Sequence, residues 1–98
     1  MDNYHARIED KLTDKFAPET LKVVDQSHLH AGHAGAREGG QTHFMVMMVS
    51  DAFEGTNRVA RQRLVYTALK EELEERVHAL SLTLRTPREA SALAQSEG

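Results

Sequence analysis

The stretch His43-Phe44-Met45-Val46-Met47-Met48-Val49-Ser50 decides the fold that we expect for this chain. Every second side chain from Phe44 to Met48 is apolar, and the side chains between them, up to Val49, are apolar as well. A strand with two apolar faces is typical of the interior of a sheet, where both faces are shielded from water. We therefore expect residues 43–50 to form a central strand.

Two further strands are predicted around this segment. Residues 20–25 combine apolar and β-branched residues and indicate a short strand before it in the chain. Residues 77–84 indicate a third strand, in which His78 opens the face that also carries the leucines. We expect the first two strands to pair antiparallel across the long loop that joins them.

Three helices complete the pattern. Residues 3–16 carry an apolar or aromatic side chain at every fourth position, which indicates an amphipathic helix. Residues 86–89, Thr-Pro-Arg-Glu, have the cap, the first-position proline and the reach-back glutamate of a helix start, and we expect that helix to fray over residues 94–98. A further helix over residues 57–74 is expected to bury Val59, Leu64, Ala68 and Leu73, with Val65 and Leu69 as additional candidates.

These elements predict an α+β fold in α-β-β-α-β-α order. A three-stranded sheet would be covered by helices on one face, and the crossover through residues 57–75 should be right-handed. Ninety-eight residues are enough for one modest core. We therefore expect a single domain over residues 1–98, with a core of about residues 4–88.

Composition narrows the classes of function. The chain is 40% hydrophobic and 28% charged, has a net charge of −3 and contains no apolar run long enough for a membrane span. Residues 1–16 are charged throughout and lack an apolar signal core, so we expect a soluble cytoplasmic protein. The chain has no cysteine. Any thiolate ligand for a soft metal site must therefore come from another molecule.

The segment from Ser27 to Phe44 carries the strongest signal for a functional site. It contains four of the six histidines and four of the six glycines, including a His-x-His-x-x-His run at positions 28, 30 and 33. Neutral imidazole is a ligand for zinc, copper, iron and nickel, and this spacing can bring two ring nitrogens to one ion. The alternative is a solvated polar loop, and spacing alone does not decide between the two.

The remaining histidines have simpler interpretations. His78 on its predicted strand is either a metal ligand or a half-buried histidine with a structural hydrogen bond, and its position alone favours the latter. His43 precedes Phe44 on the central strand, where we expect a structural hydrogen bond. His5 and His28 are expected to be solvated.

Nucleic-acid binding is the second hypothesis. Residues Gly32 to Gly35 match the Gly-x-x-Gly loop of KH domains, although here they would join two strands rather than two helices. Three arginines near a helix start, Arg58, Arg61 and Arg63, could contact phosphates. In an acidic chain they predict weak and steeply salt-dependent binding.

An enzyme is not expected. Asp25, Ser27 and His28 have the residue types of a catalytic triad, but they lie within four positions of one another and are poorly placed to converge.

The sequence resembles the BolA family over roughly residues 5–88. The resemblance lies in seven blocks that follow one another in the family's order: Leu21 to Ser27, His30 to Gly35, Thr42 to Ser50, Phe53 to Gly55, Arg61 to Val65, Glu71 to Leu73, and Val77 to Leu82. It implies a fold similar to the class II KH domain. It also implies a partnership with monothiol glutaredoxin, with which such proteins share a two-iron two-sulfur (2Fe-2S) cluster. Regulation of transcription, stress response and morphology through DNA is implied as well.

The family's ligand pair can be transferred to this sequence by position. The resemblance assigns one ligand to His78 in the Val-His-Ala-Leu block and the other to His30 in the loop, with His33 as the alternative. A glutaredoxin cysteine and glutathione would hold the other side of the cluster in a heterodimer. Alone, the chain is expected to be a monomer or a weak homodimer. One departure is Gln62, where the family usually has histidine between the two arginines.

Overall fold

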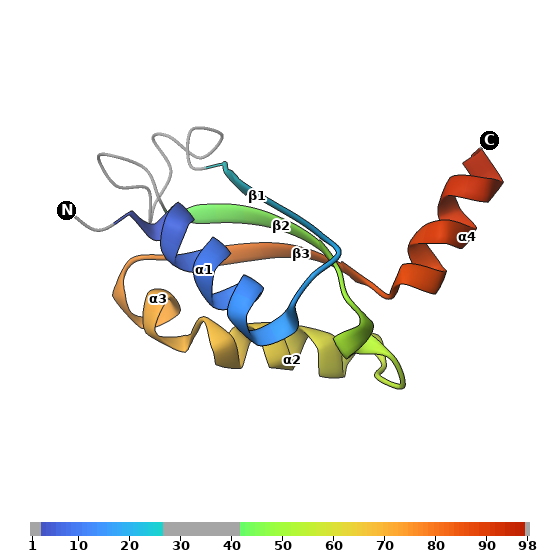
Figure 1. The fold of residues 1–98 in the computed structure, drawn as a ribbon. Helices are drawn as coiled ribbons and strands as arrows, with labels where there is room; N and C mark the ends of the chain where they lie inside the picture. The colour runs from blue at the N-terminus through green and yellow to red at the C-terminus, as the bar shows by residue number, and fades with distance from the viewer. Residues whose placement is uncertain (1–2, 27–41, 98) are drawn as a thin grey trace.

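The computed structural model describes residues 3–26 and 42–97 of the chain. These residues form the predicted α+β arrangement, in α-β-β-α-β-α order with the second helical region divided in two (Figure 1). The elements are α1 (Tyr4–Phe16), β1 (Thr20–Asp25), β2 (His43–Val49), the 3₁₀ helix η2 (Asp51–Phe53), α2 (Arg58–Ala68), α3 (Lys70–Glu75), β3 (Ala79–Arg85) and α4 (Pro87–Glu97). Within the described ranges, no helix combines the length and the apolarity that crossing a membrane requires.

The three strands form one mixed sheet with β2 in the middle. β1 pairs antiparallel with β2, and Val23 lies opposite Val46. β3 pairs parallel with β2 on its other side, and Leu82 lies opposite Val46. The prediction of a central strand over residues 43–50 is therefore confirmed.

The hydrophobic core lies between the sheet and the helices α1, α2 and α3, which share one face of the sheet (Figure 1). Phe44, Val46 and Met48 of β2 point into this core and are buried, whereas Met45 and Met47 alternate with them and are only partly buried. The predicted amphipathic helix over residues 3–16 is confirmed as α1. Its buried residues occur at every fourth position and are Tyr4, Ile8, Leu12 and Phe16.

The second predicted helix differs from expectation in two ways. It ends at Ala68, and a separate helix starts at Lys70 with no side-chain cap, so nothing in the local sequence marks the break. Val59 is 56% exposed, whereas Val65 and Leu69 are fully buried. The physical reason is angular: at about 100° per residue, Val59 lies about 240° around the helix from Val65. The expected burial of Val59 was wrong.

Helix α4 begins with the predicted capping box. The backbone N–H of Glu89 donates to the Thr86 hydroxyl at 3.1 Å, and the Glu89 carboxylate accepts from the backbone N–H of Thr86 at 2.9 Å. Two of the N–H groups that a helix start leaves unpaired are satisfied in this way. The helix projects from the end of the sheet and continues to Glu97, whereas the sequence predicts fraying from Ala94 (Figure 1).

Candidate metal-ligand site

Two histidines lie side by side at one end of the sheet. His43 is the first residue of β2, and His78 immediately precedes β3. Parallel pairing sets His43 opposite Ala79, and the rings of His43 and His78 stack with 6.2 Å between their centroids and an interplanar angle of 27°. His78 is exposed to solvent, so its imidazole is accessible to a ligand or a partner.

His78 is not a residue of the strand, contrary to the prediction of a strand over residues 77–84. Val77 is buried and anchors the connection, and β3 begins only at Ala79. The backbone N–H of His78 donates to the Thr42 carbonyl at 2.7 Å, and Ala79 donates to the same oxygen at 3.3 Å. These bonds fix the backbone of His78, while its side chain is exposed.

A buried carboxylate holds the segment that leads to His78. Glu72 of α3 is completely buried, and its carboxylate lies 2.7 Å from Arg7 Nη2 and 2.9 Å from Lys11 Nζ of α1. The Glu72 backbone carbonyl accepts the N–H groups of Arg76 and Val77. One residue therefore joins α3 to α1 and also fixes the turn before His78.

Opposing effects act on the pKa of Glu72. Burial raises the pKa, but the hydrogen bond from Lys11 and the positive charges of Lys11 and Arg7 outweigh burial, and the pKa lies below its ordinary value. Glu72 is thus ionised, and it is matched by two cations that are themselves partly exposed.

His43 makes the structural hydrogen bond that its position suggests. Its Nδ1 lies 2.8 Å from the hydroxyl oxygen of the buried Thr42. Its position beside His78 was not predicted, because that contact depends on the parallel register of β2 and β3. The available signal is that both histidines directly precede an apolar segment of a predicted strand, so a parallel pairing in register would align them.

The predicted loop residues His30, His33, Gly32 and Gly35 lie outside the described residues. The two described ends of that loop, however, meet at the histidine pair. Gln26 donates its backbone N–H to the His43 carbonyl at 2.7 Å, and Thr42 bonds to His78 as described above. The chain therefore leaves and re-enters the described structure next to His43 and His78.

The described part of the chain supplies two imidazoles to this end of the sheet. Across residues 3–26 and 42–97, there is no group of three or more His, Cys, Asp or Glu side chains that could hold a metal ion. Since the sequence contains no cysteine, thiolate ligands would come from another molecule. A shared site is the arrangement that this donor set fits.

His5 has more contacts than the predicted solvated histidine. Its Nε2–H donates to the Val23 carbonyl at 2.7 Å, and its Nδ1 lies 3.0 Å from Glu9 of the same helix, an ion pair when the ring is protonated. The ring therefore contacts both β1 and α1, although 41% of the side chain is exposed, so the prediction of a solvated His5 is only partly confirmed. His28 lies outside the described residues.

The three arginines proposed for phosphate contacts have different environments. The Arg61 side chain is only 11% exposed and donates to both oxygens of Glu89, at 2.6 and 3.2 Å, and to the Leu84 carbonyl at 3.1 Å. Arg58 and Arg63 are exposed on α2. Arg61 thus connects α2 to β3 and α4, and only Arg58 and Arg63 face solvent.

The Arg61–Glu89 pair predicts a dependence of stability on pH. Hydrogen bonds from Arg61, and from the backbone of Thr86, lower the pKa of Glu89 from 4.5 to about 2. A carboxyl with a lowered pKa stabilises the folded state fully above its unfolded pKa, and this contribution is lost as the pH falls toward the folded value. We expect Glu89→Gln to flatten the decline of the unfolding free energy between about pH 4.5 and pH 2. The effect should be at most about 1 kcal/mol because the pair is partly exposed.

Urea unfolding at several pH values between 2 and 6 measures this contribution. Glu54→Gln, which removes an exposed carboxylate after η2, is the control and should leave the slope nearly unchanged. If the unfolding free energies of the wild type and Glu89→Gln fall in parallel with pH, the Arg61–Glu89 pair does not cause this pH dependence.

Comparisons with known proteins agree with this fold. The sequence model of the family described as BolA-like protein matches residues 12–89. The chain is 46% identical over 92 residues to Protein BOLA1, chloroplastic, of Arabidopsis thaliana, covering 92% of this chain and 58% of that protein. It is 44% identical over 87 residues to the DNA-binding transcriptional regulator BolA of Escherichia coli, covering 89% of this chain and 79% of that protein.

A solved structure supports the same relationship. The BolA domain of SufE1 from Arabidopsis thaliana superimposes with a TM-score of 0.82 at 43% sequence identity, over 91% of this chain and 98% of that chain. The chain thus corresponds to nearly the whole of that domain, while it spans little more than half of the chloroplastic relative.

Proposed function

Because the chain belongs to the BolA family, we propose that it is a partner of monothiol glutaredoxin and co-ligates a bridging 2Fe-2S cluster. His78 is one ligand in this proposal, and His30 or His33 is the other. The role is in iron-sulfur trafficking or in regulation by iron and redox state, in the cytoplasm.

One observation carries the proposal: the exposed imidazole of His78 lies where the histidine-rich segment leaves and re-enters the described structure. The backbone N–H of His78 donates to the carbonyl of Thr42, the first described residue after that segment, which supports the proposal. A histidine held in this way has a fixed backbone and an exposed side chain, which suits a ligand that a partner must reach.

The donor chemistry is consistent with a shared cluster. A 2Fe-2S cluster takes four ligands, and a mixture of imidazole and thiolate ligands raises its potential relative to thiolate alone. This chain has six histidines and no cysteine, so it can supply only imidazole. The glutaredoxin cysteine and glutathione would supply the thiolates. When bound, the cluster would supply one-electron chemistry, while this chain's histidines would hold one side of it.

Mixing the chain with a monothiol glutaredoxin that carries a reconstituted cluster, in the presence of glutathione, tests the proposal. We expect the visible circular dichroism to change from that of the glutaredoxin alone, with a heterodimer on size exclusion. Cluster-free glutaredoxin is the control for protein association without ligation. A spectrum equal to the sum of the separate components would refute the proposal.

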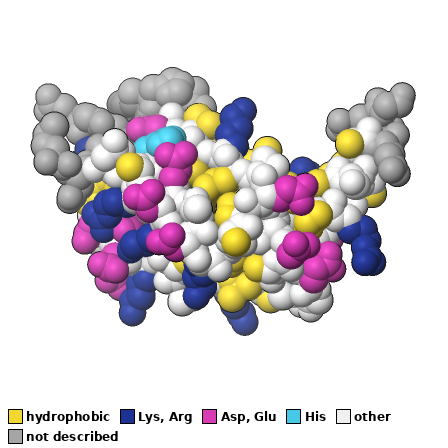
Figure 2. All heavy atoms as spheres, viewed as in Figure 1, with side chains coloured by type: hydrophobic (Ala, Val, Ile, Leu, Met, Phe, Trp, Pro, Cys, Tyr) yellow, Lys and Arg dark blue, Asp and Glu magenta, His cyan; other side chains and the backbone are white. Residues whose placement is uncertain are grey.

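DNA binding is the second candidate, and the name of the Escherichia coli relative favours it. In this chain the exposed Arg58 and Arg63 would make the contacts, since Arg61 is held by Glu89. Figure 2 shows acidic and basic side chains interspersed on the face that it presents, without a continuous basic stripe. Two phosphate contacts predict a slope of about −2 for the logarithm of affinity against that of salt concentration.

Fluorescence anisotropy with duplex DNA over a range of salt concentrations measures that slope. Replacing Arg58 and Arg63 together by glutamine should bring it close to zero. A slope that the double substitution leaves unchanged would argue against these contacts.

A further inference from the structure

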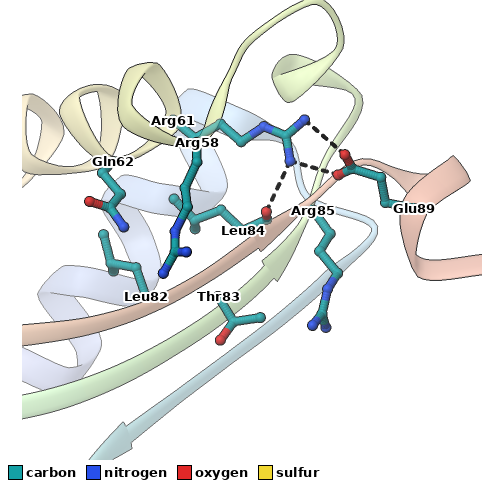
Figure 3. Close-up of a pocket in the computed structure, with 8 residues that line it drawn as sticks. All are labelled: Arg58, Arg61, Gln62, Leu82, Thr83, Leu84, Arg85 and Glu89. Atoms are coloured by element: carbon teal, nitrogen blue, oxygen red, sulfur yellow. Dashed lines mark hydrogen bonds and ion pairs between the residues drawn. The ribbon is translucent and has the colours of Figure 1, made fainter. Parts of the chain in front are cut away.

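A pocket lies at the end of β3 that is remote from His78. It has a volume of about 410 Å³ and lies between the first turns of α2, the outer edge of β3 and the start of α4. Figure 3 shows Arg58 and Gln62 extending from α2 toward Leu82 of β3, while Arg61 reaches Glu89 of α4. Leu82 is the residue of β3 in the lining that lies nearest to His78, and the four residue steps between them span about 13 Å at roughly 3.3 Å per residue.

The pocket is positively charged in an otherwise acidic chain. Its lining includes three arginines, Arg58, Arg61 and Arg85, and one carboxylate, Glu89. Glu89 is occupied by Arg61, at 2.6 Å. Among the residues that the structure describes, neither Arg58 nor Arg85 has an ion-pair partner. A ligand with negative charge would therefore find two guanidinium groups whose charge is not neutralised.

Within residues 3–26 and 42–97, no strand pairs with the outer edge of β3 beside this pocket. β3 is the last strand of the sheet and pairs only with β2. The Arg85 carbonyl accepts from Ser50 on the β2 side, whereas the Leu84 carbonyl accepts from Arg61 on the outer side. Because successive peptide groups of a strand point to opposite sides, those of Leu82 and Leu80 also point outward.

The contact of Arg61 with β3 shows that the outward carbonyls of this edge can accept hydrogen bonds. Its guanidinium occupies the outward carbonyl of Leu84, so the edge is closed at that residue and open at Leu82. An added strand would bring both an N–H and a C=O to Leu82, as edge strands require. A phosphodiester backbone has acceptors but no donors, and would leave the Leu82 carbonyl unpaired. The edge therefore favours a peptide over a nucleic acid.

We propose that this pocket binds an extended acidic peptide of a partner protein, which pairs with the outer edge of β3 at Leu82 and places a carboxylate on Arg58. Gln62, one turn after Arg58 and beside Leu82, offers a further hydrogen bond to the same peptide. This site contains neither of the proposed cluster ligands, and the part of β3 that lines it begins at Leu82, four residues after His78.

Titration with a synthetic, end-capped heptapeptide of alternating valine and glutamate, followed by NMR of the amide groups, tests the site. We expect the amides of Leu80 and Leu82 to shift and to exchange more slowly with solvent. Arg58→Gln should weaken binding at least tenfold, and so should replacing the glutamates of the peptide by glutamine. N-methylation of the central peptide residue should also abolish binding, since it removes a backbone donor.

The matched control is Arg63→Gln, which removes an exposed arginine of the same helix outside the pocket and should change affinity less than twofold. Shifts confined to other parts of the sheet, or binding that does not depend on Arg58, would overturn the proposal. So would an oligonucleotide that shifts Leu82 through Arg58 when the peptide does not. That result would assign the pocket to nucleic acid instead.

Discussion

His78→Ala is expected to abolish the change in visible circular dichroism that the wild-type chain produces with cluster-loaded glutaredoxin. The substitution removes an exposed imidazole, while the backbone bond to Thr42 does not depend on the side chain. The fold should therefore be retained and only the ligand lost. Far-ultraviolet circular dichroism of the variant checks the first point, and the visible spectrum of the mixture checks the second.

The neighbouring histidine provides the matched control for this experiment. His43→Ala removes the ring stacked on His78, together with its bond to the Thr42 hydroxyl, but not the proposed ligand. We expect this variant to keep a cluster-dependent spectrum, altered in intensity rather than lost. If His43→Ala removes the signal and His78→Ala keeps it, the ligand is His43. Single alanine substitutions at His30 and His33 then identify the loop ligand.

Glu72→Gln is expected to lower the free energy of unfolding by about 3 kcal/mol, the lower end of the range for breaking a buried ion pair. The substitution keeps the volume of the side chain but removes the charge that faces Arg7 and Lys11. The loss falls at the lower end because these cations are 27% and 32% exposed and can turn toward water. Chemical denaturation at neutral pH measures it.

A substitution at the adjacent Glu71 separates the effect of burial from the effect of charge. Glu71 also pairs with Lys11, at 3.2 Å, but its side chain is 73% exposed. Glu71→Gln removes the same charge from the same helix and should cost less than about 0.5 kcal/mol. Equal losses for the two variants would show that the buried position of Glu72 does not matter.

The sequence predicts the sheet better than it predicts the helices. The apolar residues of 43–50 correctly predict the central strand, although helices cover only one face of it and Met45 and Met47 on the other face are partly buried. The burial of Glu72 was not predicted, because it depends on cations from α1 about sixty positions away in the chain. The acidic run of residues 71–75 reads instead as a solvated helix end. The break between α2 and α3 at Leu69 was not predicted either, because no glycine, proline or capping side chain marks it in the sequence.

For the candidate site, too, the sequence predicts individual residues better than contacts between residues that are distant in the chain. The resemblance to the BolA family makes His78 a candidate ligand, and the structure adds that the described ends of the loop meet beside it. The contact between His43 and His78 follows from a parallel register over residues that are thirty-five positions apart, which no local pattern specifies. Sequence reasoning therefore proposed candidate ligands but did not predict which residues lie beside them.

The double use of Glu89 constrains how this protein can evolve. One of its oxygens, Oε1, accepts both from Arg61 and from the helix start at Thr86. Glutamine can serve the helix start, but it lacks the charge that matches a guanidinium. Selection on position 89 is therefore coupled to the residue at position 61. Where position 61 is arginine, glutamate at position 89 is favoured over glutamine. Where arginine is replaced, glutamine at position 89 can serve the helix start equally well.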